Sequence, residues 1–155
     1  MAVVYLSLGS NLGKREENIS KALGEIRENI GEITKTSSAY ETEPWGFTSP
    51  NKFINIAAEI NTALSPRELL AATQKTEEKL GRCRKVTERY EDRTIDIDIL
   101  LYDNIVTEEK DLVIPHPKMQ QRTFVMEPLA EIAPQLRHPV SGRSVKEIRD
   151  ELITK

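Results

Sequence analysis

The chain has 155 residues, of which 38% are hydrophobic and 30% are charged, a composition typical of an ordinary globular domain. Lys and Arg number 22 against 25 Asp and Glu, which argues against a general nucleic-acid binder, because such domains carry a broad basic surface. The single cysteine excludes an internal disulfide and a thiolate zinc cluster. The apolar start, residues 1–8, has no basic segment before it and is too short to span a membrane. We expect one cytoplasmic domain over residues 1–155.

Apolar periodicity predicts alternating strands and helices along the chain. A strand over residues 2–8 leads through a glycine-containing turn at 9–13 into a helix that ends at Gly31. A second strand is predicted over Ile33–Tyr40 and a third over Phe53–Ala63. In the third strand one face carries Ile54, Ile56, Ala58 and Ile60, and the other carries Phe53 and Asn55.

A second helix follows, because Ser65 suits an N-cap, Pro66 the first helical position and Glu68 a capping box. It should continue to Leu80 and lead to a fourth strand over 93–102. The order β-α-β-β-α-β is that of the ferredoxin-like α+β fold, an antiparallel sheet with both helices on one face. Residues 103–155 are expected to add a strand before Pro115, a helix near 127–133 and a last helix from about Ser144.

The fourth strand is the most informative segment. Its apolar residues alternate strictly with polar ones, Ile95, Ile97, Ile99 and Leu101 on one face and Thr94, Asp96 and Asp98 on the other. Two carboxylates that project together repel unless a cation or water lies between them, and oxygen ligands favour Mg²⁺ or Mn²⁺. The alternative is an amphipathic strand whose solvated face happens to carry two aspartates.

The segment before this strand is basic and has no helical or strand periodicity. It carries Arg82, Arg84, Lys85, Arg89 and Arg93. Beside a metal site, arginines of this kind suit a polyphosphate substrate, since guanidinium groups bind pairs of phosphate oxygens. A solvated run of charges is the alternative. The stretch 9–14 is not a phosphate loop of the Walker type, because three residues rather than four separate its glycines.

Several motifs together resemble the 6-hydroxymethyl-7,8-dihydropterin pyrophosphokinase family over nearly the whole chain. They are residues 8–13, 38–46, 53–55, 74–77, 81–84, 93–102 and 114–119. The Arg-Thr-x-Asp-x-Asp block at 93–98 and the Pro-His-Pro block at 115–117 are the most distinctive. The resemblance implies an enzyme of folate biosynthesis that transfers pyrophosphate from ATP to the pterin's hydroxymethyl group. The hydroxyl would attack the β-phosphorus in line, and AMP would leave.

The resemblance also implies roles for individual residues. Asp96 and Asp98 would be catalytic ligands of two Mg²⁺ ions, and Arg82 and Arg93 would engage the phosphates during transfer. The ATP-binding set would be Gln74, Glu77, Arg84, Lys85, the backbone of Ile99, and His116. The pterin-binding set would be Thr42, Pro44, Trp45, Phe53, Asn55, Arg122 and Phe124, with the two phenylalanines sandwiching the ring.

Other interpretations of these residues stay open. The phenylalanines could be core side chains, Asn55 could pair at a strand edge, and Glu77 could be an exposed helix residue. A ferredoxin-like module that binds nucleotide or RNA without turnover is one alternative function, although RNA binding would need basic residues where two aspartates stand. A metal-binding or regulatory protein that keeps the fold without the chemistry is a second alternative, although the aspartate pair and the arginines argue against it. A kinase that transfers only the terminal phosphate would use much the same residues. The expected partners are ATP and the pterin, with no nucleic acid or membrane, and we expect a monomer.

Overall fold

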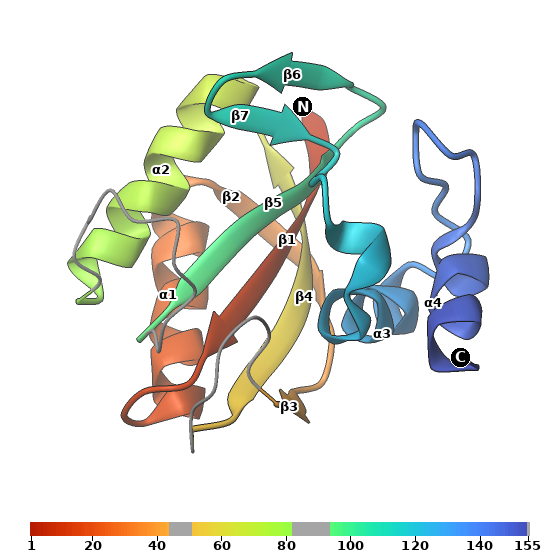
Figure 1. Ribbon diagram of the computed structural model, residues 1–155. Helices are drawn as coiled ribbons and strands as arrows, with labels where there is room; N and C mark the ends of the chain where they lie inside the picture. The colour runs from red at the N-terminus through yellow and green to blue at the C-terminus, as the bar shows by residue number, and fades with distance from the viewer. Residues whose placement is uncertain (44–50, 82–93, 155) are drawn as a thin grey trace.

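The computed structural model describes residues 1–43, 51–81 and 94–154. Of the proposed site residues, Pro44, Trp45, Arg82, Arg84, Lys85 and Arg93 lie outside these ranges. The strands are β1 (Ala2–Ser10), β2 (Gly31–Thr36), β3 (Tyr40–Thr42), β4 (Phe53–Thr62), β5 (Asp96–Tyr102), β6 (Thr107–Glu109) and β7 (Leu112–Ile114) (Figure 1). The helices are α1 (Arg15–Asn29), α2 (Pro66–Lys79), α3 (Thr123–Ile132) and α4 (Val145–Ile153), with a short 3₁₀ turn η1 (Met119–Gln121).

The main sheet is antiparallel. Its strands have the order β2-β4-β1-β5, and β3 also pairs with β4. With β2 and β4 as the second and third long strands, this is the ferredoxin-like order, and the predicted fold class is confirmed. The capping box that begins α2 is present, since Ser65 Oγ accepts from the backbone of Glu68 and the Glu68 carboxylate accepts from the backbone of Ser65.

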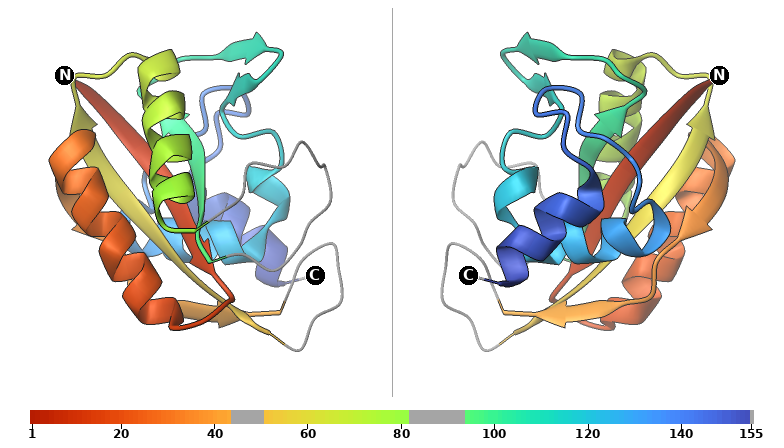
Figure 2. Two further views of the ribbon diagram at one scale, coloured as in Figure 1. Left: turned by 90° about the vertical axis from the view of Figure 1, so that its left-hand side faces the viewer. Right: turned by 90° about the vertical axis from the view of Figure 1, so that its right-hand side faces the viewer.

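One face of the sheet is covered by α1 and α2, as Figure 2 shows. Its core contains Ile56 of β4 and Ile97 of β5, packed with Ile26 of α1 and Leu69 of α2. The isoleucine faces of the third and fourth long strands therefore lie in the core as predicted. The alternation of these strands consequently places their polar partners on the opposite face.

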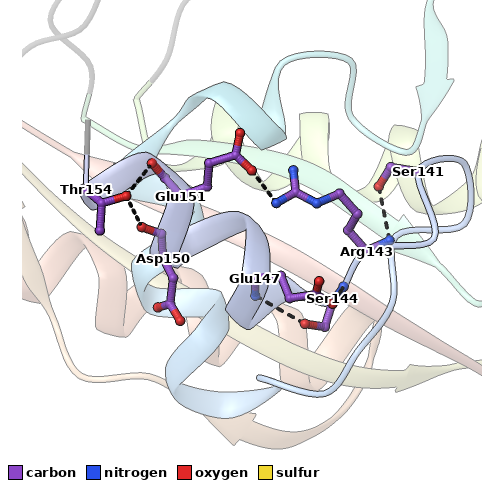
Figure 3. A network of polar contacts seen from close by, with 7 residues as sticks. All are labelled: Ser141, Arg143, Ser144, Glu147, Asp150, Glu151 and Thr154. Atoms are coloured by element: carbon purple, nitrogen blue, oxygen red, sulfur yellow. Dashed lines mark hydrogen bonds and ion pairs between the residues drawn. The ribbon is translucent and has the colours of Figure 1, made fainter.

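A second core lies on that opposite face, beneath α3 and α4 (Figure 2). Tyr5 and Ala57 of the sheet pack there with Met126 and Leu129 of α3. The last helix begins as expected, with Ser144 as its N-cap. Its capping box pairs Ser144 with Glu147, and Arg143 forms an ion pair with Glu151 one turn further on (Figure 3).

The strict alternation predicted for the fourth long strand does not extend to its end. The pairing of β1 with β5 shifts between Tyr5 and Leu6, so β5 carries a bulge near Leu100. Beyond the bulge the faces exchange. Leu101 packs in the second core and Tyr102 in the first, and the prediction that Leu101 shares the isoleucine face was wrong.

The predicted second strand, Ile33–Tyr40, is divided into β2 and β3, which both pair with the same edge of β4. Ser37 interrupts the ladder between them. Its N–H donates to the Ala57 carbonyl at 2.9 Å, but the Ala57 N–H donates to Ser37 Oγ, also at 2.9 Å, rather than to a backbone carbonyl. The single extra strand predicted before Pro115 is a hairpin, β6–β7. No helix in the described ranges combines the length and apolar character needed to cross a bilayer.

Candidate active site

Two rows of residues run across the neighbouring strands β4, β1 and β5. In the first row, Gly9 of β1 pairs with Asn55 of β4 and Asp96 of β5. In the second row, Ser7 lies between Ala57 and Asp98 in the same way. Residues two apart on a strand share a face, so Asp96 and Asp98 lie together on the face opposite the isoleucines, with Asn55 across the sheet from Asp96.

Gly9 is required by the close approach of its neighbours. A Cβ atom at this position would lie 2.7 Å from Asn55 Oδ1 and 3.4 Å from Phe53 Cδ1. The site therefore has a floor of bare backbone between Asn55 and Asp96. Sequence reasoning assigned Gly9 to a turn, whereas it lies inside β1. Its place beside Asn55 depends on strand register, which local sequence does not reveal.

The amide of Asn55 is buried and fixed. Asn55 is only 3% exposed, and its Nδ2 donates to Thr42 Oγ1 at 2.8 Å. Thr42 in turn pairs with Phe53 in the β3–β4 ladder. Thr42, Phe53 and Asn55, predicted separately as pterin ligands, thus form one group at this end of β4.

A cavity of about 380 Å³ lies between α2, β5 and the β6–β7 hairpin. All of the proposed ATP ligands in the described residues line it: Gln74, Glu77, Ile99 and His116. Asp96 and Asp98 line it as well. The wall formed by the hairpin, residues 110–113, was not identified from the sequence, because two three-residue strands leave too short a pattern.

Glu77 is a buried carboxylate rather than an exposed helix residue. It is 7% exposed, and its Oε2 accepts a hydrogen bond of 2.7 Å from the backbone N–H of Ile97. Because β5 is an edge strand, this N–H points away from β1. Peptide groups two residues apart point the same way, so the Ile99 backbone faces the same cavity-lining edge.

His116 is held as a neutral imidazole. Burial, and next the positive charge of Arg122, lowers its pKa to about 4, against an opposing effect of Asp96. Its backbone N–H donates to the Leu100 carbonyl at 3.0 Å, and its Nδ1 accepts from the backbone N–H of Lys118 at 3.2 Å. We therefore assign the ring proton to Nε2, which makes that nitrogen a donor.

Arg122 and Phe124 begin α3 and lie together. Arg122 is 6% exposed, and its guanidinium carbon lies 5.4 Å from the centre of the Phe124 ring, within the range of a cation–π contact. Phe124 is half-buried against the second core. Its ring is therefore neither a deeply buried core side chain nor fully solvated.

The two aspartates fit a hard divalent cation only in part. In the part of the chain that the structure describes, no group of three or more His, Cys, Asp and Glu is arranged to hold a metal. Asp96 and Asp98 are half-buried and both line the cavity. An octahedral Mg²⁺ held by one or two carboxylates takes its other oxygens from water or from substrate phosphates, so the pair suits a metal that arrives with a nucleotide.

The sequence model of the 7,8-dihydro-6-hydroxymethylpterin-pyrophosphokinase (HPPK) family matches residues 5–134. This range contains the residues that line the cavity and the row formed by Gly9, Asn55 and Asp96. The chain belongs to the HPPK family. Two relatives bear the name 2-amino-4-hydroxy-6-hydroxymethyldihydropteridine pyrophosphokinase. The protein of Porphyromonas gingivalis is 47% identical over 141 residues, covering 90% of this chain and 95% of the relative. The protein of Bacillus subtilis is 44% identical over 135 residues, covering 86% and 80%.

Solved HPPK structures share the fold. A crystal structure of the HPPK-DHPS protein of Plasmodium falciparum superposes with a TM-score of 0.81 at 16% identity. The alignment covers 99% of this chain and 44% of that one, so the chain spans less than half of the longer protein. At this identity the likeness shows the fold alone.

Proposed function

We propose that this HPPK-family chain transfers diphosphate from ATP to the hydroxymethyl group of 6-hydroxymethyl-7,8-dihydropterin, releasing AMP, as a step of folate biosynthesis. The observation that carries the proposal is the place of Asp96. It lines the cavity with the proposed ATP ligands, and it shares a row across the sheet with Asn55. The two proposed substrate sites therefore meet at one carboxylate.

The cavity offers polar groups suited to a nucleotide. The neutral His116 would donate from Nε2 to a phosphate or sugar oxygen, and Lys110 adds a cation in the hairpin wall. The outward-facing backbone of Ile99 would pair with the edge of the base. Gln74 on α2 provides an amide for the same purpose. Specific recognition of this kind needs a few fixed polar groups in a largely preformed cavity.

We propose that Asp96 and Asp98 bind two Mg²⁺ ions together with the ATP phosphates. Bound Mg²⁺ would neutralise charge on the phosphate oxygens and make the pterin hydroxyl more acidic. The contribution of the protein is to hold the two carboxylates on one strand face. Catalysis then depends on positioning the alcohol and the β-phosphorus, with no covalent intermediate on a side chain.

The Asn55 group, which consists of Thr42, Phe53 and Asn55, would bind the pterin. Gly9 lets the side chains of Asn55 and Phe53 lie close against β1. The amide of Asn55, fixed by Thr42, would recognise the ring's amide-like edge. Phe53 and Phe124 would stack on its faces, with Arg122 beside Phe124. The remaining assignments rest on the family resemblance alone: Pro44 and Trp45 at the pterin, and Arg82, Arg84, Lys85 and Arg93 at the phosphates.

Incubation with ATP, Mg²⁺ and the pterin alcohol tests the proposal directly, with the nucleotide product followed in the presence and absence of pterin. Pterin-dependent AMP that disappears on chelation of Mg²⁺ is the expected result. ADP would indicate transfer of the terminal phosphate by a conventional kinase. Binding of both ligands without turnover would favour a binding module.

We also propose that residues 1–155 act as one domain and as a monomer that needs no nucleic acid. Both cores are built on the two faces of a single sheet, which supports one folding unit. The molar mass from light scattering at the assay concentration tests the oligomeric state, and a dimer mass would contradict the proposal.

A further inference from the structure

Glu131, near the end of α3, accepts hydrogen bonds from the segment that joins β2 to β3. Its Oε2 accepts from the backbone N–H of Ser38 at 2.8 Å. Its Oε1 accepts from the Ser38 hydroxyl at 2.5 Å and from the Tyr40 hydroxyl at 2.7 Å. One carboxylate thus accepts from three donors that lie more than 90 residues away in the sequence. None of these residues lines the cavity, whereas Tyr40 is the partner of Asn55 in the β3–β4 ladder.

The other side of the same segment is fixed to β4. Ser37 exchanges two hydrogen bonds of 2.9 Å with the backbone of Ala57. The joining segment is therefore held between β4 on one side and α3 on the other. Glu131 therefore links α3 to the residues just before β3 and at its start.

The two elements joined in this way carry opposite sides of the proposed pterin site. Strand β3 carries Thr42, which accepts the hydrogen bond that fixes Asn55. Helix α3 carries Phe124 and begins beside Arg122. The cavity proposed for ATP is instead lined from α2, β5, the hairpin and the turn after it, with no contribution from β3 or α3 among the described residues.

From these contacts we infer that Glu131 is a positioning residue for the pterin: it sets the separation of β3 and α3, and with it the fit of the ring, without affecting the ATP cavity. The carboxylate form suits this task. The Ser38 and Tyr40 hydroxyls lower the pKa of Glu131, so it accepts all three donors at neutral pH. The inference rests on the proposed function, since it presumes that the Asn55 group binds the pterin.

The test compares Glu131→Ala, Tyr40→Phe and the double variant with the wild-type chain in the AMP assay. Glu131→Ala should raise the KM for pterin about three- to tenfold, the scale of hydrogen bonds lost at an exposed carboxylate, while the KM for ATP stays within about twofold. Tyr40→Phe should give a smaller rise. In the double variant the Tyr40 change should add nothing, because its acceptor is already gone. Glu28→Ala, at an exposed position on α1, is the matched control.

Equal rises in both KM values, or an unchanged pterin KM in Glu131→Ala, would overturn the inference and leave Glu131 a purely structural residue. If Glu131→Ala does not fold, Tyr40→Phe gives the same comparison with a milder change. A wild-type chain that makes no AMP would instead refute the proposed function. Calorimetric binding of pterin in the presence of a non-hydrolysable ATP analogue, with the same variants, would then still test Glu131.

Discussion

The carboxylate of Glu77 on α2 accepts a hydrogen bond of 2.7 Å from the backbone N–H of Ile97, the residue between Asp96 and Asp98 on β5. The peptide groups along the outer edge of an edge strand have no neighbouring strand to bond with. Here the buried side chain of Glu77 bonds one of these groups. The same carboxylate lines the cavity. The positions of both aspartates relative to the proposed nucleotide site therefore depend on Glu77.

Glu77→Ala should weaken both the fold and the use of ATP. The Ile97 N–H would lose its partner in a buried setting, and we expect the free energy of unfolding to fall by about 1–3 kcal/mol. Because the two aspartates would lose their fixed position, the KM for ATP should rise about tenfold or more. Urea unfolding and steady-state kinetics measure the two effects separately.

Glu78→Ala is the matched control, since Glu78 is the next residue of α2 and is exposed. It should change stability by less than about 0.5 kcal/mol, as is usual for surface positions. A Glu77→Ala chain that is less stable but keeps its KM for ATP would show that the contact with Ile97 is only structural.

The sequence predicted that Asp96 and Asp98 share one face of the sheet, because the isoleucines that alternate with them must all face the core. The same reasoning failed at Leu101, since the bulge before it exchanges the two faces and a bulge leaves no periodic mark. It also failed to separate β2 from β3, because the interruption at Ser37 depends on its side-chain contact with β4.

Contacts between distant segments were the least predictable part of the site. The capping boxes of α2 and α4 are local contacts, because each is formed by a serine and a glutamate three residues further along the sequence. The pairing of Gly9 with Asn55, by contrast, depends on register between strands 46 residues apart, and the three donors on Glu131 depend on how α3 packs. Neither relationship has a signature in a single sequence.

Gly9→Ala should impair the pterin side of the reaction. The added Cβ would lie 2.7 Å from Asn55 Oδ1, so Asn55 must move and its bond to Thr42 must weaken. We expect the KM for pterin to rise at least about tenfold, with a much smaller change for ATP. Gly24→Ala is the control, because its Cβ position in α1 has no atom within 4 Å apart from its chain neighbours and the adjacent backbone of the helix. It should stabilise the chain by about 0.5–1 kcal/mol and leave both KM values unchanged.

Asp98→Asn should abolish transfer. The amide is nearly the same size as the carboxylate but removes a charge that Mg²⁺ requires, and a loss of about a thousandfold or more in kcat corresponds to about 4 kcal/mol of transition-state stabilisation. Product AMP measured across a Mg²⁺ titration is the test. Asp150→Asn on α4, outside both proposed sites, should keep near wild-type turnover. A wild-type rate for Asp98→Asn at saturating Mg²⁺ would remove Asp98 from the metal site.

His116 should make the folded chain less stable in mild acid. Its pKa is about 4 in the folded chain against the ordinary 6.5, so between these values the unfolded chain binds the extra proton. The free energy of unfolding is then undiminished above pH 6.5 and falls as the pH drops towards 4, by about 3 kcal/mol at most. Urea unfolding at pH 7.5 and pH 4.5 measures this loss.

The His116→Asn chain isolates this contribution, because an asparagine does not titrate and its carbonyl can accept from the Lys118 N–H. The wild-type chain should lose more stability between the two pH values than the variant does. The pKa of His138 is also lowered by burial, but this residue is present in both chains and its effect cancels in the difference. Equal losses in the two chains would mean that the pKa of His116 in the folded chain stays near its ordinary 6.5. The KM for ATP would then show an inflection near pH 6.5, which a ring that is neutral throughout this range excludes.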